Sequence, residues 1–226
     1  MSEEPLTLIS ATPSSFARMP RIALALKNIP FTVVNEIPWH ATTQTPQHNP
    51  LEKLPILLFP DGRPPVYESA HIQNYIVEKY ADRGPLLLPG NLDDNLLAKQ
   101  IVALSVGCMD ALVLSGWEVR RPVERQSKLW IARQERKIDG AMCAFNAYVE
   151  EALARGSSAE FVLGHELSIA DIAIVCAVGG VDFVGFKATW RVQYPSLAGY
   201  FDRLDEMDVF KETRPVMFDL KDEAVV

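Results

Sequence analysis

Cysteine is scarce in this sequence, which holds only Cys108, Cys143 and Cys176 among its 226 residues. An odd and sparse set of cysteines gives no disulfide framework. No histidine or further cysteine lies three or four residues from any of them, which argues against a zinc site. All three stand in apolar helical patterns, so we expect buried structural thiols and no metal centre.

An excess of positive charge is also lacking, because the sequence has 22 Lys and Arg but 29 Asp and Glu, which gives a net charge of −7. Phosphate binding needs a basic face, so nucleic acid is not expected as a partner. No Lys/Arg cluster of the kind that binds anionic membranes is present, and the longest apolar run, IAIVCAVGGV, is too short to cross a bilayer. The N-terminus starts acidic and has no signal-peptide core. We therefore expect a soluble, cytoplasmic protein without a membrane partner.

The first part of the chain alternates short β-type runs with helical patterns. The order is strand, helix, strand, a loop, and then two strands and a helix. The strands are expected at 6–10, 31–37, 55–59 and 65–69, and the helices at 21–28 and 69–80.

The pattern changes after Lys79 to a stretch rich in Gly, Pro and Asp, and then to apolar residues at three- and four-residue steps. Ser168 and Asp171 precede an apolar run with the S-x-x-D spacing of a capping box, which predicts a helix start. We expect a first domain at 1–82, a linker at 83–92 and an all-helical domain at 93–226.

Two neighbouring serines, Ser14 and Ser15, lie in the stretch ATPSSFARMPRIALALKNIPF, where a strand gives way to a helix. A serine at a helix start can accept a hydrogen bond from a free backbone N–H, so either residue fits a cap. Pro20 lacks a backbone donor and disfavours the helical region for Met19, so we expect an irregular first turn. The residues alone leave open whether these serines only cap the helix or also take part in chemistry.

Four stretches, in this order and spacing, carry a family resemblance: TPSSFARMPRIALALKNIPF, NPLEKLPIL, VYESAHIQNYI and LSIADIAI. With them, the sequence resembles the cytosolic glutathione S-transferases over nearly the whole chain. Two further stretches, NEIPWHATTQTPQHNP and MDALVLSGWEVRRPVERQSKLWIARQERKI, look most like a serine-type subgroup found in bacteria and fungi. The resemblance implies an α+β fold, in which a thioredoxin-like βαβ-ββα domain precedes an all-α domain. It also implies glutathione as co-substrate and a homodimer.

The resemblance also implies where each part of glutathione is held. Glu68 pairs with the γ-glutamyl ammonium, and Ser69 faces the γ-glutamyl carboxylate from the positive end of a helix. A cis Leu54–Pro55 bond turns a peptide edge toward the cysteinyl backbone. Lys53 is the first candidate for the glycyl carboxylate, and His40 is the second. Without the resemblance, Ser69 is simply a helix cap and Glu68 a surface acid.

The thiol needs a hydrogen-bond donor, because the pKa of a cysteine thiol is near ~8.5. The resemblance places Ser14 at the catalytic position and Ser15 where a proline is usual, so Ser15 is the alternative donor. A hydrogen bond to the thiolate is worth roughly 1.5–3 kcal/mol, or about one to two pKa units. The electrophile is expected between the domains, against a stripe of side chains at helical spacing, although such a stripe is more often core than pocket. This stripe comprises Met109, Val113, Trp117 and Arg120.

We therefore expect a glutathione transferase of the detoxification type, which activates glutathione as a thiolate for attack on a small electrophilic, apolar substrate. An isomerase or peroxidase that uses the same thiolate is an alternative. A glutathione-binding regulatory protein without turnover is another. A disulfide reductase is disfavoured, because no cysteine occupies position 14 or 15.

Overall fold

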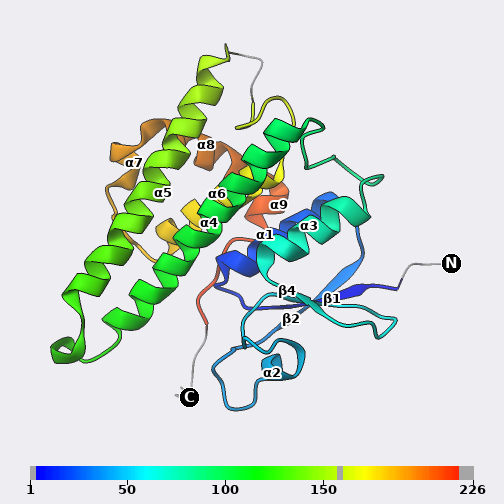
Figure 1. The fold of residues 1–226 in the computed structure, drawn as a ribbon, viewed down its shortest axis with the longest axis horizontal. Helices are drawn as coiled ribbons and strands as arrows, with labels where there is room; N and C mark the ends of the chain where they lie inside the picture. Colours follow the sequence, from blue (N-terminus) through cyan, green and yellow to red (C-terminus); the bar gives the residue numbers. More distant parts are fainter. Residues whose placement is uncertain (1–3, 157–159, 219–226) are drawn as a thin grey trace. The chain divides into compact units, whose positions relative to one another are not determined.

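The computed structural model describes residues 4–156 and 160–218, shown as a ribbon in Figure 1. These residues divide into two compact units. One unit combines residues 4–86 with 209–218, and the other comprises residues 87–208. By their contacts, residues 209–218 therefore group with the start of the chain.

The first unit is built on a four-stranded mixed sheet with the strand order β2-β1-β3-β4. β1 runs parallel to β2 and antiparallel to β3, which in turn is antiparallel to β4. This confirms the predicted βαβ-ββα order, to which the structure adds one short helix in the predicted loop. The elements are β1 (Leu6–Ser10), α1 (Ser15–Leu26), β2 (Phe31–Asn35), α2 (Thr45–His48), β3 (Ile56–Leu58), β4 (Val66–Tyr67) and α3 (Ser69–Lys79).

An apolar core lies between the sheet and the two longer helices, α1 and α3, which pack against each other (Figure 1). Leu8 of β1 and Leu57 of β3 meet Leu24 of α1 and Ile72 of α3 there, all fully buried. Burying one such side chain contributes roughly 1.5–3 kcal/mol. This packing fixes the ends of the strands, from which the loops of the candidate site extend.

Helix α1 starts at Ser15 and continues through Pro20, so the expected irregular first turn and the expected start at residue 21 are wrong. Met19 and Ile22, on either side of the proline, are fully buried. Their packing therefore outweighs the hydrogen bond that Pro20 cannot donate, a loss of about 3 kcal/mol in a helix interior. After the helix, Asn28 has φ of 53°, a left-handed conformation that asparagine tolerates at a helix end.

The second unit is helical, as predicted. Its long helices α4 and α5 pack along each other, and α4 also packs along α6, which is buried from Ile169 to Val181. α8 packs against α5, α6 and α7. The helices are α4 (Leu92–Val119), the 3-10 turn η1 (Val123–Arg125), α5 (Lys128–Ala154), α6 (Ile169–Phe183), α7 (Trp190–Gln193) and α8 (Pro195–Asp205), and α9 (Asp208–Lys211) crosses into the first unit.

The predicted capping box at the start of α6 is confirmed. The Ser168 backbone N–H and hydroxyl both donate to the Asp171 carboxylate at 2.7 Å, and the Val162 N–H donates to it at 2.9 Å. The Tyr200 hydroxyl donates to the same carboxylate. Burial, and then the neighbouring Asp171, hold the pKa of Tyr200 well above its usual value, so the hydroxyl keeps the proton that it donates.

Two details of the second unit differ from the sequence-based expectation. Cys143 is exposed on α5, whereas Cys108 and Cys176 are buried as predicted, and burial raises the pKa of Cys108 to about 12. Within the described residues, α4 is the one helix that is long and apolar enough to cross a membrane, by length and composition only. It packs along α5 and α6, as the core helix of a helical unit does.

Candidate active site

The strand register gathers the predicted glutathione residues of the first unit at one end of the sheet. Ile9 of β1 pairs with Ile56 of β3, which pairs with Tyr67 of β4. The residues after β1, before β3 and after β4 therefore extend from the same end. They are Ser14, Leu54–Pro55 and Glu68–Ser69.

Ser14 is the N-cap of α1. Its backbone N–H donates to the Ala11 carbonyl at 3.0 Å, and its hydroxyl accepts from the Ala17 N–H at 3.1 Å. Within residues 4–156 and 160–218 the hydroxyl donates to no acceptor, so its proton is available to a ligand. Capping and chemistry are thus compatible at this residue, because the cap uses the oxygen and leaves the proton.

Ser15 is the first residue of α1 and belongs to the helix that Ser14 caps. No side-chain hydrogen bond of Ser15 occurs among the described residues. The structure thus gives the two serines different places at the turn.

The Leu54–Pro55 peptide bond is cis, as the resemblance implied. In the described part of the chain, the N–H and C=O of Leu54 make no backbone hydrogen bond. This peptide edge is therefore unpaired at the same end of the sheet as Ser14. Lys53, just before it, has an exposed side chain.

Asn49 orders this loop from inside, a role that the sequence analysis missed. Its side chain is buried, its amide N–H donates to the Lys53 carbonyl at 2.9 Å, and its amide oxygen accepts from the Leu51 N–H at 3.0 Å. The signal in the sequence was the Asn-Pro pair before Leu51, since asparagine commonly bonds to backbone two residues on.

Glu68 and Ser69 form the start of α3. Glu68 has φ of 70° and ψ of 121° and makes no side-chain cap bond, while its side chain is exposed. Ser69 is 2% exposed. The first intrahelical bond of α3 is donated by Ile72 to the Glu68 carbonyl, so the N–H groups of the first turn have no acceptor within the helix. Such free N–H groups at a positive helix end suit a carboxylate ligand.

A polar loop after β2 lies beside β1, because the Glu36 N–H donates to the Ser10 carbonyl at 2.8 Å. The Glu36 carboxylate accepts from the hydroxyls of Thr43 and Thr45 at 2.6 and 2.9 Å. These bonds lower the pKa of Glu36 further than its partial burial raises it. The loop carries His40, whose ring bonds to the Thr42 hydroxyl at 2.8 Å.

The predicted electrophile stripe on α4 has two kinds of surroundings. Met109 is 1% exposed, like a core residue, whereas Val113 and Trp117 are 45% and 37% exposed. The Arg120 guanidinium lies over the Trp117 ring, 5.3 Å from its centroid.

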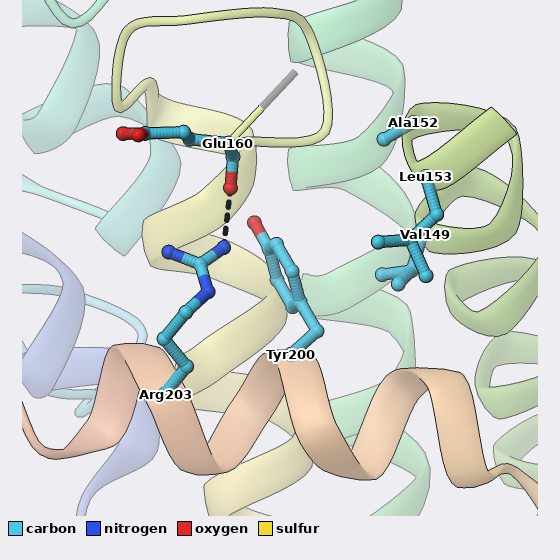
Figure 2. A pocket seen from close by; sticks show the side chains of 6 residues that line it. All are labelled: Val149, Ala152, Leu153, Glu160, Tyr200 and Arg203. Carbon is cyan, nitrogen blue, oxygen red and sulfur yellow. Dashed lines mark hydrogen bonds between the residues drawn. The ribbon is translucent and has the colours of Figure 1, made fainter. Parts of the chain in front are cut away.

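A pocket of about 280 Å³ in the second unit involves none of the predicted site residues (Figure 2). Val149, Ala152 and Leu153 of α5 form its apolar wall, opposite Tyr200 and Arg203 of α8. Its polar groups are engaged within the protein, because Arg203 donates to the Glu160 carbonyl and Tyr200 to Asp171. The pocket therefore shares no lining residue with the candidate site in the first unit.

Comparisons with known proteins identify the family. Models of the glutathione S-transferase N-terminal and C-terminal domains match residues 13–79 and 130–203. The uncharacterized GST-like protein YibF of Escherichia coli (strain K12) is 30% identical, with 93% of this chain and 98% of the relative covered. The chain belongs to the glutathione S-transferase family.

Further relatives of this glutathione S-transferase family member include a solved transferase and an isomerase. A glutathione S-transferase from Methylobacterium radiotolerans, crystallised with glutathione sulfonate, is 38% identical, covers 98% of this chain and 100% of its own, and has a TM-score of 0.86. Probable maleylacetoacetate isomerase 1 of Drosophila melanogaster is 29% identical over 92% of this chain and 80% of the relative. In the part of the chain that the structure describes, the family member has no group of three His, Cys, Asp or Glu residues that could hold a metal ion.

Proposed function

We propose that this protein is a glutathione transferase, which binds glutathione at the end of the sheet and activates its thiol for attack on a small electrophilic, apolar substrate. The observation that carries the proposal is the convergence of Ser14, the unpaired Leu54 peptide edge and the free first turn of α3 at that end. The related transferase from Methylobacterium radiotolerans with bound glutathione sulfonate supports it.

The γ-glutamyl end would be held at the start of α3. Its carboxylate accepts from the Ser69 hydroxyl and from the free first-turn N–H groups, where the helix dipole favours negative charge. Its ammonium pairs with the exposed Glu68 carboxylate. The conformation of Glu68 fits this role, because a non-glycine residue with φ of 70° is strained, and such strain is concentrated at functional sites.

The rest of the tripeptide would follow the sheet end toward the loop after β2. The cysteinyl backbone pairs with the N–H and C=O of Leu54, which Pro55 holds in place. Lys53 meets the glycyl carboxylate, and His40 is the second candidate. These anchors fix the sulfur relative to Ser14, so that its position does not depend on the electrophile.

Ser14 would then donate its free proton to the sulfur. The hydroxyl is neither base nor nucleophile; it stabilises the thiolate by roughly 1.5–3 kcal/mol, which lowers the pKa of the thiol by about one to two units. The thiol proton leaves to solvent as the thiolate forms. The thiolate attacks the electrophilic carbon, a C–S bond forms, and the electron pair leaves with a leaving group or, on an activated double bond, takes up a proton.

The electrophile would lie against the exposed part of the α4 stripe, which offers an aliphatic side chain, an indole and a guanidinium from Val113, Trp117 and Arg120. Met109 would support this surface from the core. The active form would be a homodimer, in keeping with the family resemblance, and cytoplasmic.

A second candidate function is a glutathione-dependent isomerase, which the relationship to a probable maleylacetoacetate isomerase favours. The same thiolate would add to an activated cis double bond, single-bond rotation would follow, and expulsion of the thiolate would restore the double bond in the trans form. No atom is gained or lost overall. A cis-olefin converted without net loss of glutathione would distinguish this reaction from transfer.

The proposed thiol activation is tested by titrating bound glutathione in the ultraviolet, where the thiolate absorbs. Ser14→Ala should raise the pKa of the bound thiol by about one to two units, since one hydrogen bond to the thiolate is lost. Ser15→Ala is the matched control and should have the smaller effect. Glutathione affinity should change less than turnover, because the γ-glutamyl and glycyl anchors remain.

Two outcomes would change the conclusion. A raised pKa in Ser15→Ala, with Ser14→Ala unchanged, would assign the donor to Ser15. A wild type that binds glutathione without thiolate at neutral pH, and turns over no electrophile, would contradict the transferase and favour a glutathione-binding regulatory protein.

A further inference from the structure

The end of the described chain, residues 214–218, returns to the turn that carries Ser14; we name this segment the C-terminal strap. The Val216 N–H donates to the Thr12 carbonyl at 3.0 Å, two residues before Ser14. In Figure 1 the strap descends from α9 beside the start of α1. It belongs to the same compact unit as the sheet.

The root of the strap is anchored on the first turns of α1. Arg18 is 2% exposed, and its guanidinium donates to the Phe210 carbonyl at 2.8 Å and to the Thr213 hydroxyl at 3.3 Å. Arg18 in turn donates its backbone N–H to the Ser14 carbonyl at 3.0 Å. These partners show that Arg18 joins the helix of Ser14 to the chain before the strap.

The far end of the strap contacts a second loop. The ring of Phe218 meets the ring of Trp39 edge-on, with centroids 5.6 Å apart. Trp39 precedes His40 in the loop whose Thr43 and Thr45 hydroxyls donate to the Glu36 carboxylate. The strap therefore joins the turn that presents Ser14 to the loop at the glycyl side of the proposed glutathione site.

The turn of Ser14 is held from three directions. Ser14 donates backward to Ala11, accepts forward from Ala17 through its hydroxyl, and is fixed sideways by the bond from Val216 to Thr12. The backward and forward bonds are local, so they move with the turn. The sideways bond connects the turn to a segment that is distant in the sequence, and its loss would let the Ser14 hydroxyl shift relative to the sulfur.

We propose that the C-terminal strap is part of the active site, with Val216 as a positioning residue for Ser14 and Phe218 as a positioning residue for the loop at the glycyl end. The inference rests on the proposed function. It assigns the two ends of the strap to two quantities that can be measured separately. Val216 affects the pKa of the bound thiol, and Phe218 affects the KM for glutathione.

The test of the first end uses Val216→Pro, which removes the N–H that Thr12 accepts, with Val216→Ala as a control that keeps the N–H. Val216→Pro should raise the pKa of bound glutathione by about half a unit to one unit and lower kcat in proportion, since one neutral hydrogen bond is lost. The KM for glutathione should stay near the wild-type value. Val216→Ala should match the wild type in all three quantities.

The test of the second end uses Phe218→Ala, with Phe218→Tyr as a control that keeps the ring. Phe218→Ala should raise the KM for glutathione about two- to tenfold, the effect of losing one aromatic pair. The pKa of the bound thiol should stay unchanged, and Phe218→Tyr should behave as the wild type. If Val216→Pro does not fold, an unchanged KM for glutathione in Phe218→Ala overturns the inference by itself.

A purely structural strap would lower the melting temperature in Val216→Pro and Phe218→Ala while leaving the thiol pKa and the KM at wild-type values, and this result would overturn the inference. The proposed function fails in a different way, through a wild type that activates no glutathione. In that case the strap has no site to position, and the inference fails with it.

Discussion

The backbone of Glu68 offers a test that separates the stability of the protein from its affinity for glutathione. Its φ of 70° and ψ of 121° cost a non-glycine residue of order 1–3 kcal/mol. Glu68→Gly removes that strain, and Glu68→Ala keeps it, while both remove the carboxylate. Glycine itself costs roughly 0.5–1 kcal/mol more than alanine in chain entropy. The free energy of unfolding of Glu68→Gly should therefore exceed that of Glu68→Ala by about 1 kcal/mol.

Urea unfolding of the two variants, extrapolated linearly to water, measures this difference. Calorimetry on the same samples should show that both variants bind glutathione more weakly than the wild type, because both lack the partner of the γ-glutamyl ammonium. A Glu68→Gly protein that is no more stable than Glu68→Ala would refute the backbone strain at this residue. Wild-type affinity for glutathione in both variants would show that Glu68 does not bind the ligand.

Ser69→Ala should weaken glutathione binding by roughly 1–3 kcal/mol, since a hydrogen bond to a carboxylate is lost, and equal dissociation constants in calorimetry would contradict this. The pKa of Glu36 is below 4.5 in the folded protein, because bonds from Thr43, Thr45 and Gln44 outweigh the burial that raises it. The Glu36 carboxylate therefore contributes fully to the stability of the folded protein above pH ~4.5, and this contribution disappears as the pH falls through the lowered pKa. The stability deficit of Glu36→Gln at pH 7 should accordingly shrink at low pH in acid-induced unfolding curves. A thiol reagent should label one cysteine of the native protein, Cys143, and reach Cys108 and Cys176 only on unfolding; mass spectrometry of a native sample labelled at more than one cysteine would show otherwise.

Local patterns were sufficient to predict the order of elements in the first unit and the start of α6. The alternation in LTLIS and the helical spacing after Ser69 are signals carried by neighbouring residues, and β1 and α3 follow them. The Ser168 and Asp171 capping box is likewise local. The cis bond before Pro55 was predicted through the family resemblance, since an X–Pro sequence does not by itself specify the isomer.

Features that depend on packing between distant segments were not predictable in this way. Pro20 suggests an irregular turn, and the burial of Met19 and Ile22 overrides it. The return of residues 209–218 to the first unit joins Val216 to Thr12 across about 200 residues, and no periodicity indicates such a pair. Cys143 lies in an apolar helical pattern, and its exposure depends on which face of α5 is covered.

A crystal structure of the protein with glutathione would show whether this end of the sheet binds and activates the tripeptide. We expect the sulfur within hydrogen-bond distance of the Ser14 hydroxyl, the γ-glutamyl carboxylate at Ser69, and the cysteinyl backbone paired with Leu54. A sulfur bound by Ser15, or glutathione bound away from this end of the sheet, would contradict the proposed mechanism.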